Sequence, residues 1–217
     1  IDYLLDKVLP FVKNENLADF VDIFCEKGVF DINQSRHYLH ESKKMGFKLK
    51  LHGDEIVQLG GAELAADLGA VSADHLLNAS KDGISKMAEK GVIATLLPAT
   101  AFNLKEKYAN AKLMINSGCA VALATDFNPG SSFTNSIPLV IALAALKMNM
   151  NIQEIIIALT INGACAVGKQ DSIGSLDVGK KADILILSYP SIDFLPYHTG
   201  VNLVKTVIKN GQVVLDR

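Results

Sequence analysis

The chain has 217 residues, of which 49% are hydrophobic and 20% charged, and it contains no Trp. This composition is typical of a globular protein with a sizeable buried core and excludes a disordered chain. The formal net charge is -2, with basic and acidic residues interleaved. Neither nucleic acid nor a strongly basic partner is therefore expected.

The cysteines and the apolar runs indicate the cellular compartment. Cys25, Cys119 and Cys165 are far apart and odd in number, so they form neither a CxxC pair nor a disulfide framework. The N-terminal residues lack the basic and apolar segments of a signal peptide. The longest apolar runs, residues 137–146 and 155–159, are too short to span a bilayer. We expect a cytoplasmic protein with no membrane association.

Short apolar runs alternate with longer amphipathic segments, which indicates repeated β-then-α units and a parallel sheet. After an N-terminal helix, the expected strands span residues 20–25, 47–51, 70–73, 92–97 and 119–125. The expected helices span residues 34–45, 61–68, 81–89, 105–115, 138–148 and 152–167. Glycines directly follow several of these segments and support the helix ends, among them Gly46, Gly69 and Gly91.

The pattern changes after Gly174. Short strands are expected at residues 183–187, 204–208 and 213–215. The dipeptide Asn210-Gly211 between the last two is a strong β-hairpin signal. We therefore place a domain boundary between residues 172 and 173.

The number of β-then-α units decides between two folds. About five are visible, whereas a closed (β/α)8 barrel needs eight and typically about 250 residues. A doubly wound open sheet would fit five units, but its usual Gly-rich turn after the first strand is absent. We predict an α/β chain. Residues 1–172 form an incomplete (β/α)8 TIM barrel, and residues 173–217 form a small all-β tail.

Reactive side chains follow the expected strands. His52 and Glu55 follow one strand, His75 follows the next, and Asp126 follows the strand at residues 119–125. Because the carboxyl ends of all strands in a parallel barrel open on one face, these side chains are expected to converge there. His and Asp suit Zn²⁺ or Fe²⁺, and such an ion lowers the pKa of bound water from about 15.7 to about 7. The pattern favours metal-dependent hydrolysis.

Each of these residues also has an ordinary structural interpretation. His52 and His75 can be hydrogen-bonded residues at strand ends, Asp126 can cap the following helix, and Glu55 can lie beside a helix dipole. Their recurrence at successive strand ends favours the shared site.

The remaining histidines and one cysteine are interpreted as structural or solvated. His37 and His40 lie three residues apart on a polar helix and are expected to be solvated. His198 lies in a turn-rich apolar stretch and is expected to be structural, and Cys119 begins a buried strand and is expected to be inert.

The loop after Asp126 has the composition of a binding loop. Asn128, Gly130 and Ser131 belong to the segment FNPGSS, which offers an amide, free backbone N–H groups and two hydroxyls. These groups suit a small polar or anionic substrate.

Several segments together resemble a known family. They are KLHGDEI (50–56), GGAELAADLGAVSADHLL (60–77), LLPATAF (96–102), ALATDFNPGSS (122–132) and LPYHTGVN (195–202). Together with the strand-end His and Asp residues, they resemble the amidohydrolase superfamily and, within it, the imidazolonepropionase family. The similarity covers essentially the whole chain.

The resemblance implies roles for individual residues. His52 and Asp126 would be ligands of one Zn or Fe ion, with further ligands from an N-terminal part. His75 would polarise the attacked carbonyl, Asp126 would accept the proton of the attacking water, and Glu55 would help to pass protons and hold the ring. Substrate contacts would come from Glu55 and from the loop residues Asn128, Gly130 and Ser131.

The implied reaction is hydrolysis of the ring amide C–N bond of 4-imidazolone-5-propanoate to N-formimino-L-glutamate in histidine degradation. Family members are cytoplasmic and often homodimeric. The family's His-x-His pair on its first barrel strand has no counterpart here, so we expect the chain to be the C-terminal half of a longer protein. The resemblance then implies that residues 1–172 are the C-terminal half of the (β/α)8 TIM barrel of a metal-dependent hydrolase, and that residues 173–217 are the C-terminal part of a small β-sandwich. With two ligands, the isolated chain is expected to hold metal weakly or not at all. Two alternatives stay open: an inactive truncated module that needs a partner, and another cyclic amidohydrolase or deaminase of the same superfamily.

The half-barrel hypothesis predicts that residues 1–217 do not fold autonomously. Open sheet edges rich in apolar residues favour pairing with another chain, and the barrel interior lacks the layers that other strands contribute. Size-exclusion chromatography and denaturant unfolding of the 217-residue chain alone are expected to show aggregation. Addition of an N-terminal half in trans is expected to rescue its folding. A soluble monomer with one sharp unfolding transition would contradict the hypothesis.

Overall fold

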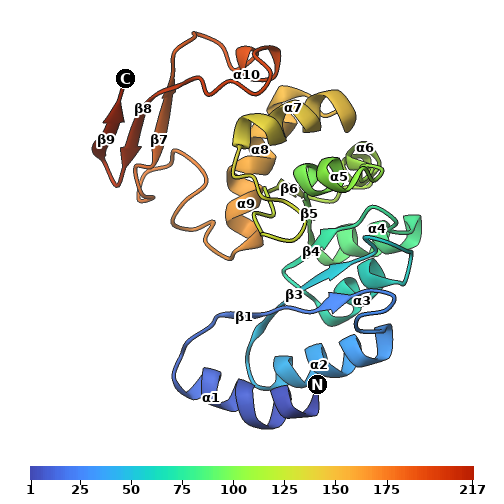
Figure 1. Cartoon of the computed structure of the whole chain (residues 1–217). Helices are drawn as coiled ribbons and strands as arrows, with labels where there is room; N and C mark the ends of the chain where they lie inside the picture. The colour runs from blue at the N-terminus through green and yellow to red at the C-terminus, as the bar shows by residue number, and fades with distance from the viewer. The chain divides into compact units, whose positions relative to one another are not determined.

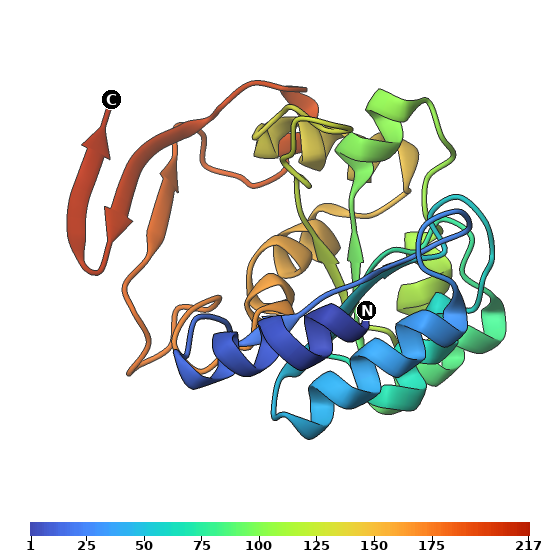
Figure 2. The same cartoon turned by 60° about the horizontal axis from the view of Figure 1, so that its bottom comes forward.

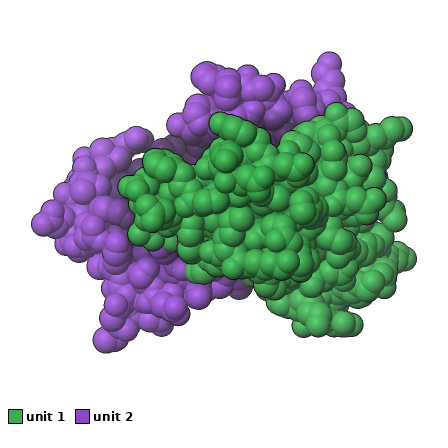
Figure 3. All heavy atoms as spheres, turned by 90° about the horizontal axis from the view of Figure 1, so that it is seen from below, with its two compact units in different colours: residues 1–96, 113–121 green, residues 97–112, 122–217 purple.

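The computed structural model describes all 217 residues, which divide into two compact units. Unit 1 contains residues 1–96 and 113–121, and unit 2 contains residues 97–112 and 122–217 (Figure 3). The domain boundary at residues 172 and 173 stays a prediction. No helix combines the length and apolarity needed to cross a bilayer.

Unit 1 is built from β-then-α units around a parallel sheet. Its strands are β1 (Phe20–Val21), β2 (Phe24–Cys25), β3 (Lys48–Gly53), β4 (Ser72–His75) and β5 (Ile93–Leu96). Its helices are a π-helix (Leu4–Val8), α1 (Leu9–Asn14), α2 (Ile32–Lys44), α3 (Gly61–Leu68) and α4 (Lys81–Lys90). The strand order is β1-β3-β4-β5, with β2 also paired to β3, and the pairs are parallel. The predicted parallel α/β architecture is confirmed.

Strand β3 shows how the sequence sets the two faces of this sheet. Leu49 and Leu51 are buried, and helices α2 and α3 pack on this strand (Figure 1). Lys50 and His52 alternate with them and are only half-buried. Successive side chains of a strand point to opposite faces, so one face carries the apolar core and the other carries polar groups.

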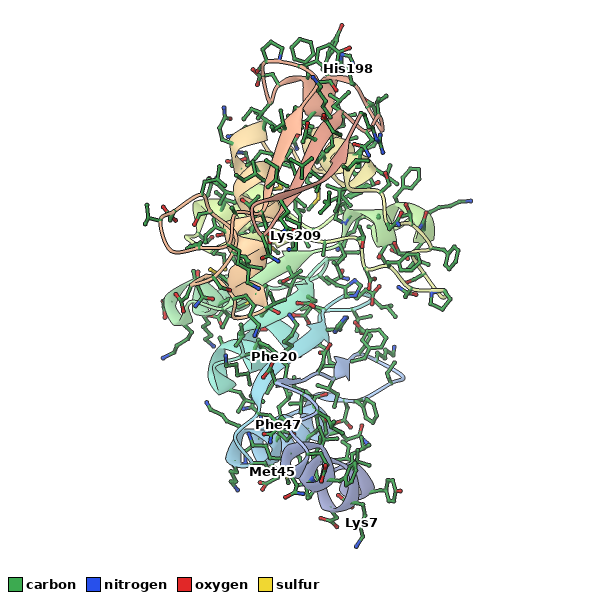
Figure 4. The ribbon with its side chains drawn as sticks, turned by 90° about the vertical axis from the view of Figure 1, so that its left-hand side faces the viewer. Lys7, Phe20, Met45, Phe47, His198 and Lys209 are labelled. Atoms are coloured by element: carbon green, nitrogen blue, oxygen red, sulfur yellow. The ribbon has the colours of Figure 1, made fainter.

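Two phenylalanines at the start of the sheet make cation–π contacts, and one of these contacts involves α1. Phe20 and Phe47 are both labelled in Figure 4, and each ring lies beneath a lysine. Lys48 Nζ is 5.6 Å from the Phe20 centroid, and Lys13 Nζ is 5.1 Å from the Phe47 centroid. Lys13 also donates to the carbonyl of Gly46 at 3.0 Å. Such cation–π contacts contribute about 0.5–1 kcal/mol each at exposed positions.

Unit 2 contains helices and a small antiparallel sheet. The helices that lie wholly in it are α5 (Pro98–Leu104), α7 (Ile137–Lys147), α8 (Ile152–Leu159), α9 (Ile161–Ala166) and α10 (Phe194–Tyr197). Helix α6 (Ala111–Asn116) and strand β6 (Val121–Leu123) each cross a unit boundary in the sequence. All of β6 is buried, as expected from its apolar sequence.

The tail strands β7 (Ile184–Leu187), β8 (Val204–Lys209) and β9 (Gln212–Asp216) form an antiparallel sheet in that order, coloured orange to red in Figure 2. Asn210 and Gly211 both have positive φ, 50° and 78°, which confirms the hairpin expected between β8 and β9. Lys209 (labelled in Figure 4) donates to Asp183 at the edge of this sheet. The second sheet of a sandwich stays a prediction.

Two expected helices were wrong in their extent. The helix expected at residues 105–115 is shorter than expected and begins only at Ala111, as α6. A separate helix, α5, precedes it with Pro98 in its first turn and ends where Lys105 adopts a left-handed φ of 59°. The helix expected at residues 152–167 divides at Thr160, whose φ of -113° and ψ of -93° leave the helical region. The expected strand at residues 20–25 is likewise divided, into β1 and β2.

A polar network lies across the half-polar face of β3 and β4. Lys50 lies opposite Ser72 in the register and donates to its hydroxyl. Ser72 in turn donates to Asp74 Oδ1 at 2.9 Å, and Lys50 Nζ lies 3.7 Å from the same oxygen. Burial raises the pKa of Asp74, while the charges of Lys50 and His52 and the Ser72 hydrogen bond oppose the rise.

This network predicts a pH-dependent stability difference for Asp74→Asn. Because the folded-state pKa of Asp74 is raised, the folded state binds a proton more tightly than the unfolded chain, whose Asp pKa is about 3.9. Wild-type stability from this group is therefore lost as the pH rises from about 4 through the folded-state pKa. Urea unfolding of the complete gene product over this range is expected to show Asp74→Asn gaining stability relative to wild type with rising pH.

The matched control is Asp82→Asn, because the Asp82 side chain is 70% exposed on α4. Asp82 is paired with Lys86 at 2.8 Å, so this control accounts for the loss of a surface carboxylate and its lysine partner. Asp74→Asn also removes the partner of Lys50. This changes the free energy of unfolding by an amount that stays constant over this pH range, since lysine stays charged. The prediction would be contradicted if the stability of Asp74→Asn relative to wild type fell or stayed constant as the pH rises.

Candidate functional site

His52 and His75 lie side by side in unit 1. The register of β3 with β4 pairs His52 with Asp74 and Gly53 with His75. The two imidazole rings are 5.3 Å apart between centroids and inclined at 52°. Two of the predicted site residues are thus brought together at the carboxyl ends of neighbouring parallel strands, as expected.

The ring of His52 is oriented by a carboxylate. Asp22 Oδ2 lies 2.8 Å from His52 Nδ1, and Asp22 is in the short segment between β1 and β2. Metal-binding histidines usually give one ring N–H to a carboxylate, which leaves the other nitrogen as the ligand atom. The donor chemistry at His52 therefore fits a metal ion bound through Nε2.

His75 is paired with Glu55. Glu55 Oε1 lies 3.4 Å from His75 Nδ1, and the side chains are 12% and 5% exposed. A carboxylate facing Nδ1 favours a proton on that nitrogen and stabilises the charged imidazolium. Each histidine of the pair thus has its own carboxylate, and the second pair is more buried than the first.

The backbone at His75 is held in an uncommon conformation. His75 and Leu76 are consecutive residues with φ of 74° and 60°. Residues other than glycine rarely adopt this left-handed region, and each such position costs on the order of 1–3 kcal/mol. The backbone carbonyl of Gly53 accepts from the Leu76 N–H at 3.2 Å, which helps to hold the chain there. Such strained positions cluster at functional sites.

Asp126 belongs to unit 2, where it follows β6. One of its oxygens, Oδ2, accepts a hydrogen bond of 2.7 Å from Thr100 Oγ1 in α5. Asp126 itself has a positive φ of 52°. The structure therefore gives this carboxylate a fixed orientation within its unit, through a buried threonine that the sequence pattern did not single out.

The loop after Asp126 differs from the expectation of free backbone N–H groups. Asn128 Oδ1 accepts from the N–H groups of both Gly130 and Ser131, each at 2.8 Å. Asn128 Nδ2 donates to the carbonyl of Asp126 and to Ser131 Oγ. The asparagine thus closes its own turn, because its short amide can reach backbone groups two and three residues ahead. The substrate-contacting roles of Asn128, Gly130 and Ser131 stay predictions.

The residues expected to lie outside the site are placed accordingly. The side chains of His37 and His40 are each 54% exposed on α2, which confirms the solvated interpretation. Cys119 is buried, and burial raises the pKa of its thiol to about 11, which confirms that it is inert. The His198 ring (labelled in Figure 4) packs against Tyr189 and other aromatic rings, as expected for a structural residue.

Sequence reasoning missed the partners of the site residues. Asp22 lies inside the apolar run at residues 20–25, and Glu26 directly follows it. Asp22 contacts His52, and Glu26 accepts a hydrogen bond from the backbone N–H of Glu55. An acidic residue inside a short apolar strand is rarely left without a partner, because an unpaired buried charge is costly. That signal was present in the sequence.

Comparison with proteins of known name identifies relatives over nearly the whole chain. An imidazolonepropionase of Clostridium tetani is 63% identical over 214 residues, covering 99% of this chain and 51% of the relative. An imidazolonepropionase of Parabacteroides distasonis is 57% identical over 215 residues, covering 99% of this chain and 52% of the relative. The chain spans about half the length of the curated relatives it matches.

Solved structures share the fold. An adenosine deaminase from Xanthomonas campestris with bound zinc has a TM-score of 0.75 at 18% identity, covering 96% of this chain and 55% of the other. Atrazine chlorohydrolase from Arthrobacter aurescens complexed with zinc has a TM-score of 0.70 at 18% identity, covering 89% and 49%. These are proteins with the predicted (β/α) barrel fold of metal-dependent hydrolases. The family model described as "Amidohydrolase family" matches residues 43–215, and the chain therefore belongs to the amidohydrolase family.

Proposed function

We propose that the protein containing this chain hydrolyses the ring amide C–N bond of 4-imidazolone-5-propanoate to give N-formimino-L-glutamate. The observation that carries the proposal is the pair of adjacent imidazoles, His52 and His75, each with its own carboxylate. The identity of 63% to an imidazolonepropionase supports the choice of substrate within the amidohydrolase family.

The proposal includes one Zn or Fe ion. His52 would hold it through Nε2, since Nδ1 faces Asp22, and Asp126 would provide a carboxylate oxygen. The remaining ligands would come from parts of the protein outside these residues. The chemistry that such an ion supplies when bound is activation of water as a nucleophile at neutral pH. The zinc bound in the two solved structures that share the fold supports this donor set.

His75 is assigned to the carbonyl oxygen of the substrate amide. Its Nδ1 faces Glu55, and Nε2 is the nitrogen that would polarise the carbonyl and stabilise negative charge that develops there. Glu55 balances the positive charge of the imidazolium and can relay a proton through it. Burial of both side chains strengthens this interaction, because water screens it less.

Asp126 is assigned as the acceptor of the proton that leaves the attacking water. The hydrogen bond from Thr100 orients its carboxylate for that role. The loop of Asn128, Gly130 and Ser131 would present the Ser131 hydroxyl to the propanoate group of the substrate. Because that loop is already braced by its own hydrogen bonds, substrate binding would need little reordering.

The reaction itself is the direct test of the proposed function. The complete gene product is expected to convert 4-imidazolone-5-propanoate to N-formimino-L-glutamate, followed by mass spectrometry of the product. Chelation is expected to abolish the conversion, and restoring Zn²⁺ or Fe²⁺ to recover it. Purine and pyrimidine-type substrates are assayed in parallel. Turnover of those rings, with none of the imidazolone, would replace the proposal with a deaminase.

His75→Asn tests the assignment of the catalytic histidine. Removal of one donor to a developing oxyanion typically lowers kcat by about 10²–10³-fold. Metal content and the unfolding midpoint are expected to stay near wild type, because Asn tolerates a left-handed φ well. His37→Asn on the exposed face of α2 is the matched control and is expected to keep full activity. Wild-type kcat in a folded, metal-containing His75→Asn protein would contradict the role.

A further inference from the structure

Glu26 is a fully buried acid whose carboxylate is satisfied by backbone N–H groups. It follows β2 and has 0% exposure. Oε2 accepts from the N–H groups of Glu55 at 3.0 Å and Ile56 at 2.9 Å. Oε1 accepts from those of Lys27 at 2.8 Å and Val57 at 3.3 Å. The carboxylate of Glu26 therefore reaches across to the loop that carries Glu55.

A second buried carboxylate fixes the remainder of that loop. Asp54 Oδ1 accepts from the N–H groups of Leu59, Gly60 and Gly61, and Oδ2 accepts from Ala62 at 2.9 Å. These bonds place the start of α3. The stretch between Asp54 and α3 is thus attached to two internal acids, and Glu26 is the one that holds the residues next to the site.

The peptide groups on both sides of Glu55 are held. Glu26 accepts from its N–H, and Asn78 Nδ2 donates to its carbonyl oxygen at 2.7 Å. The N–H of Asn78 donates to the carbonyl of Asp54 at 2.7 Å, so the segment after His75 is bonded to the same loop. The backbone that aims Glu55 at His75 is therefore fixed from two directions.

Core packing does not account for this arrangement. Ile56, whose N–H is bound by Glu26, exposes 62% of its surface, and Gln58 is also exposed. A buried ionised group is costly unless it is hydrogen-bonded, and bonds to a carboxylate are stronger than bonds between neutral groups. The hydrogen bonds to the Glu26 carboxylate therefore order a loop whose side chains bury little apolar surface.

We propose that Glu26 is a positioning residue for Glu55, setting the distance from Glu55 Oε1 to His75 Nδ1. The inference rests on the proposed function, in which that pair polarises the substrate carbonyl. Glutamine at position 26 has one acceptor oxygen in place of two, and its NH2 group would face N–H donors. Some of the hydrogen bonds from the backbone N–H groups of Glu55, Ile56 and Val57 would then be lost.

Amide hydrogen exchange tests the loop contact without any assay of activity. In the complete gene product, Glu26→Gln is expected to speed exchange at residues 55–57 about 10-fold or more, since each lost charge-assisted bond contributes about 1.5–3 kcal/mol. Exchange in β5 is expected to stay unchanged. Glu89→Gln, at an exposed position of α4, is the matched control. Unchanged exchange at residues 55–57 in a folded Glu26→Gln protein would overturn the proposal.

Kinetics on the same variants test whether the contact acts through Glu55. Misplacement of a reacting group by about 1 Å can lower the rate on the order of 10²-fold. Glu26→Gln is expected to lower kcat 10- to 100-fold with KM changed less than about 3-fold and metal content kept. In a Glu55→Gln background the same substitution is expected to have little further effect on kcat, because the residue it positions is already altered. Full additivity of the two substitutions would overturn the positioning role.

Asn78→Ala keeps the proposal testable if Glu26→Gln does not fold. It removes the hydrogen bond from the half-buried Asn78 side chain to the Glu55 carbonyl, and it is expected to show the same lowering of kcat with little change in KM. Wild-type kcat in Asn78→Ala would overturn the inference. If wild type itself does not hydrolyse the imidazolone, the proposed function fails, and the exchange measurement still decides whether Glu26 holds the loop.

Discussion

Parallel pairing of β3 with β4 is the constraint on which the candidate site depends. It sets His52 against Asp74 and Gly53 against His75, so both imidazoles leave the sheet at the same edge. A strand repeats every two residues, and a slip of one residue would exchange Leu51 and His52 between the faces. The apolar side chains Leu49 and Leu51 oppose that slip, since a shift of one residue would remove them from the face that the helices cover.

Four carboxylates in or next to the strands of this sheet have different partners. Asp22 orients an imidazole, Asp74 is compensated by Lys50 and Ser72, and Glu26 and Asp54 accept from backbone N–H groups. Buried charges persist in proteins when each has partners of this kind. The unit therefore keeps several carboxylates near the site without leaving any of these four unbonded. Their partners also fix the geometry of the histidine pair.

Local patterns were enough to predict the repeated β-then-α units, because glycines and apolar spacing mark the element ends. Helix α3 was predicted at Gly61–Leu68, and the hairpin at Asn210 was predicted from two residues. The division of the helix at Thr160 was not, since it depends on backbone angles that its neighbours do not encode. The positions of His52 and His75 followed from strand ends. Their carboxylate partners Asp22 and Glu55 required the fold, which brings together residues 30 and 20 positions apart respectively.

The left-handed backbone at His75 and Leu76 has a consequence for protein engineering. Asparagine or glycine would relieve the conformational cost at these positions, so a screen that rewards thermal stability alone would favour replacing the histidine. Under the role proposed for His75, such a screen would select proteins that are more stable but inactive. Directed evolution of this scaffold for heat resistance should hold position 75 constant and seek its gains in the exposed tail sheet, where Val213 and Val214 are 62% and 60% exposed.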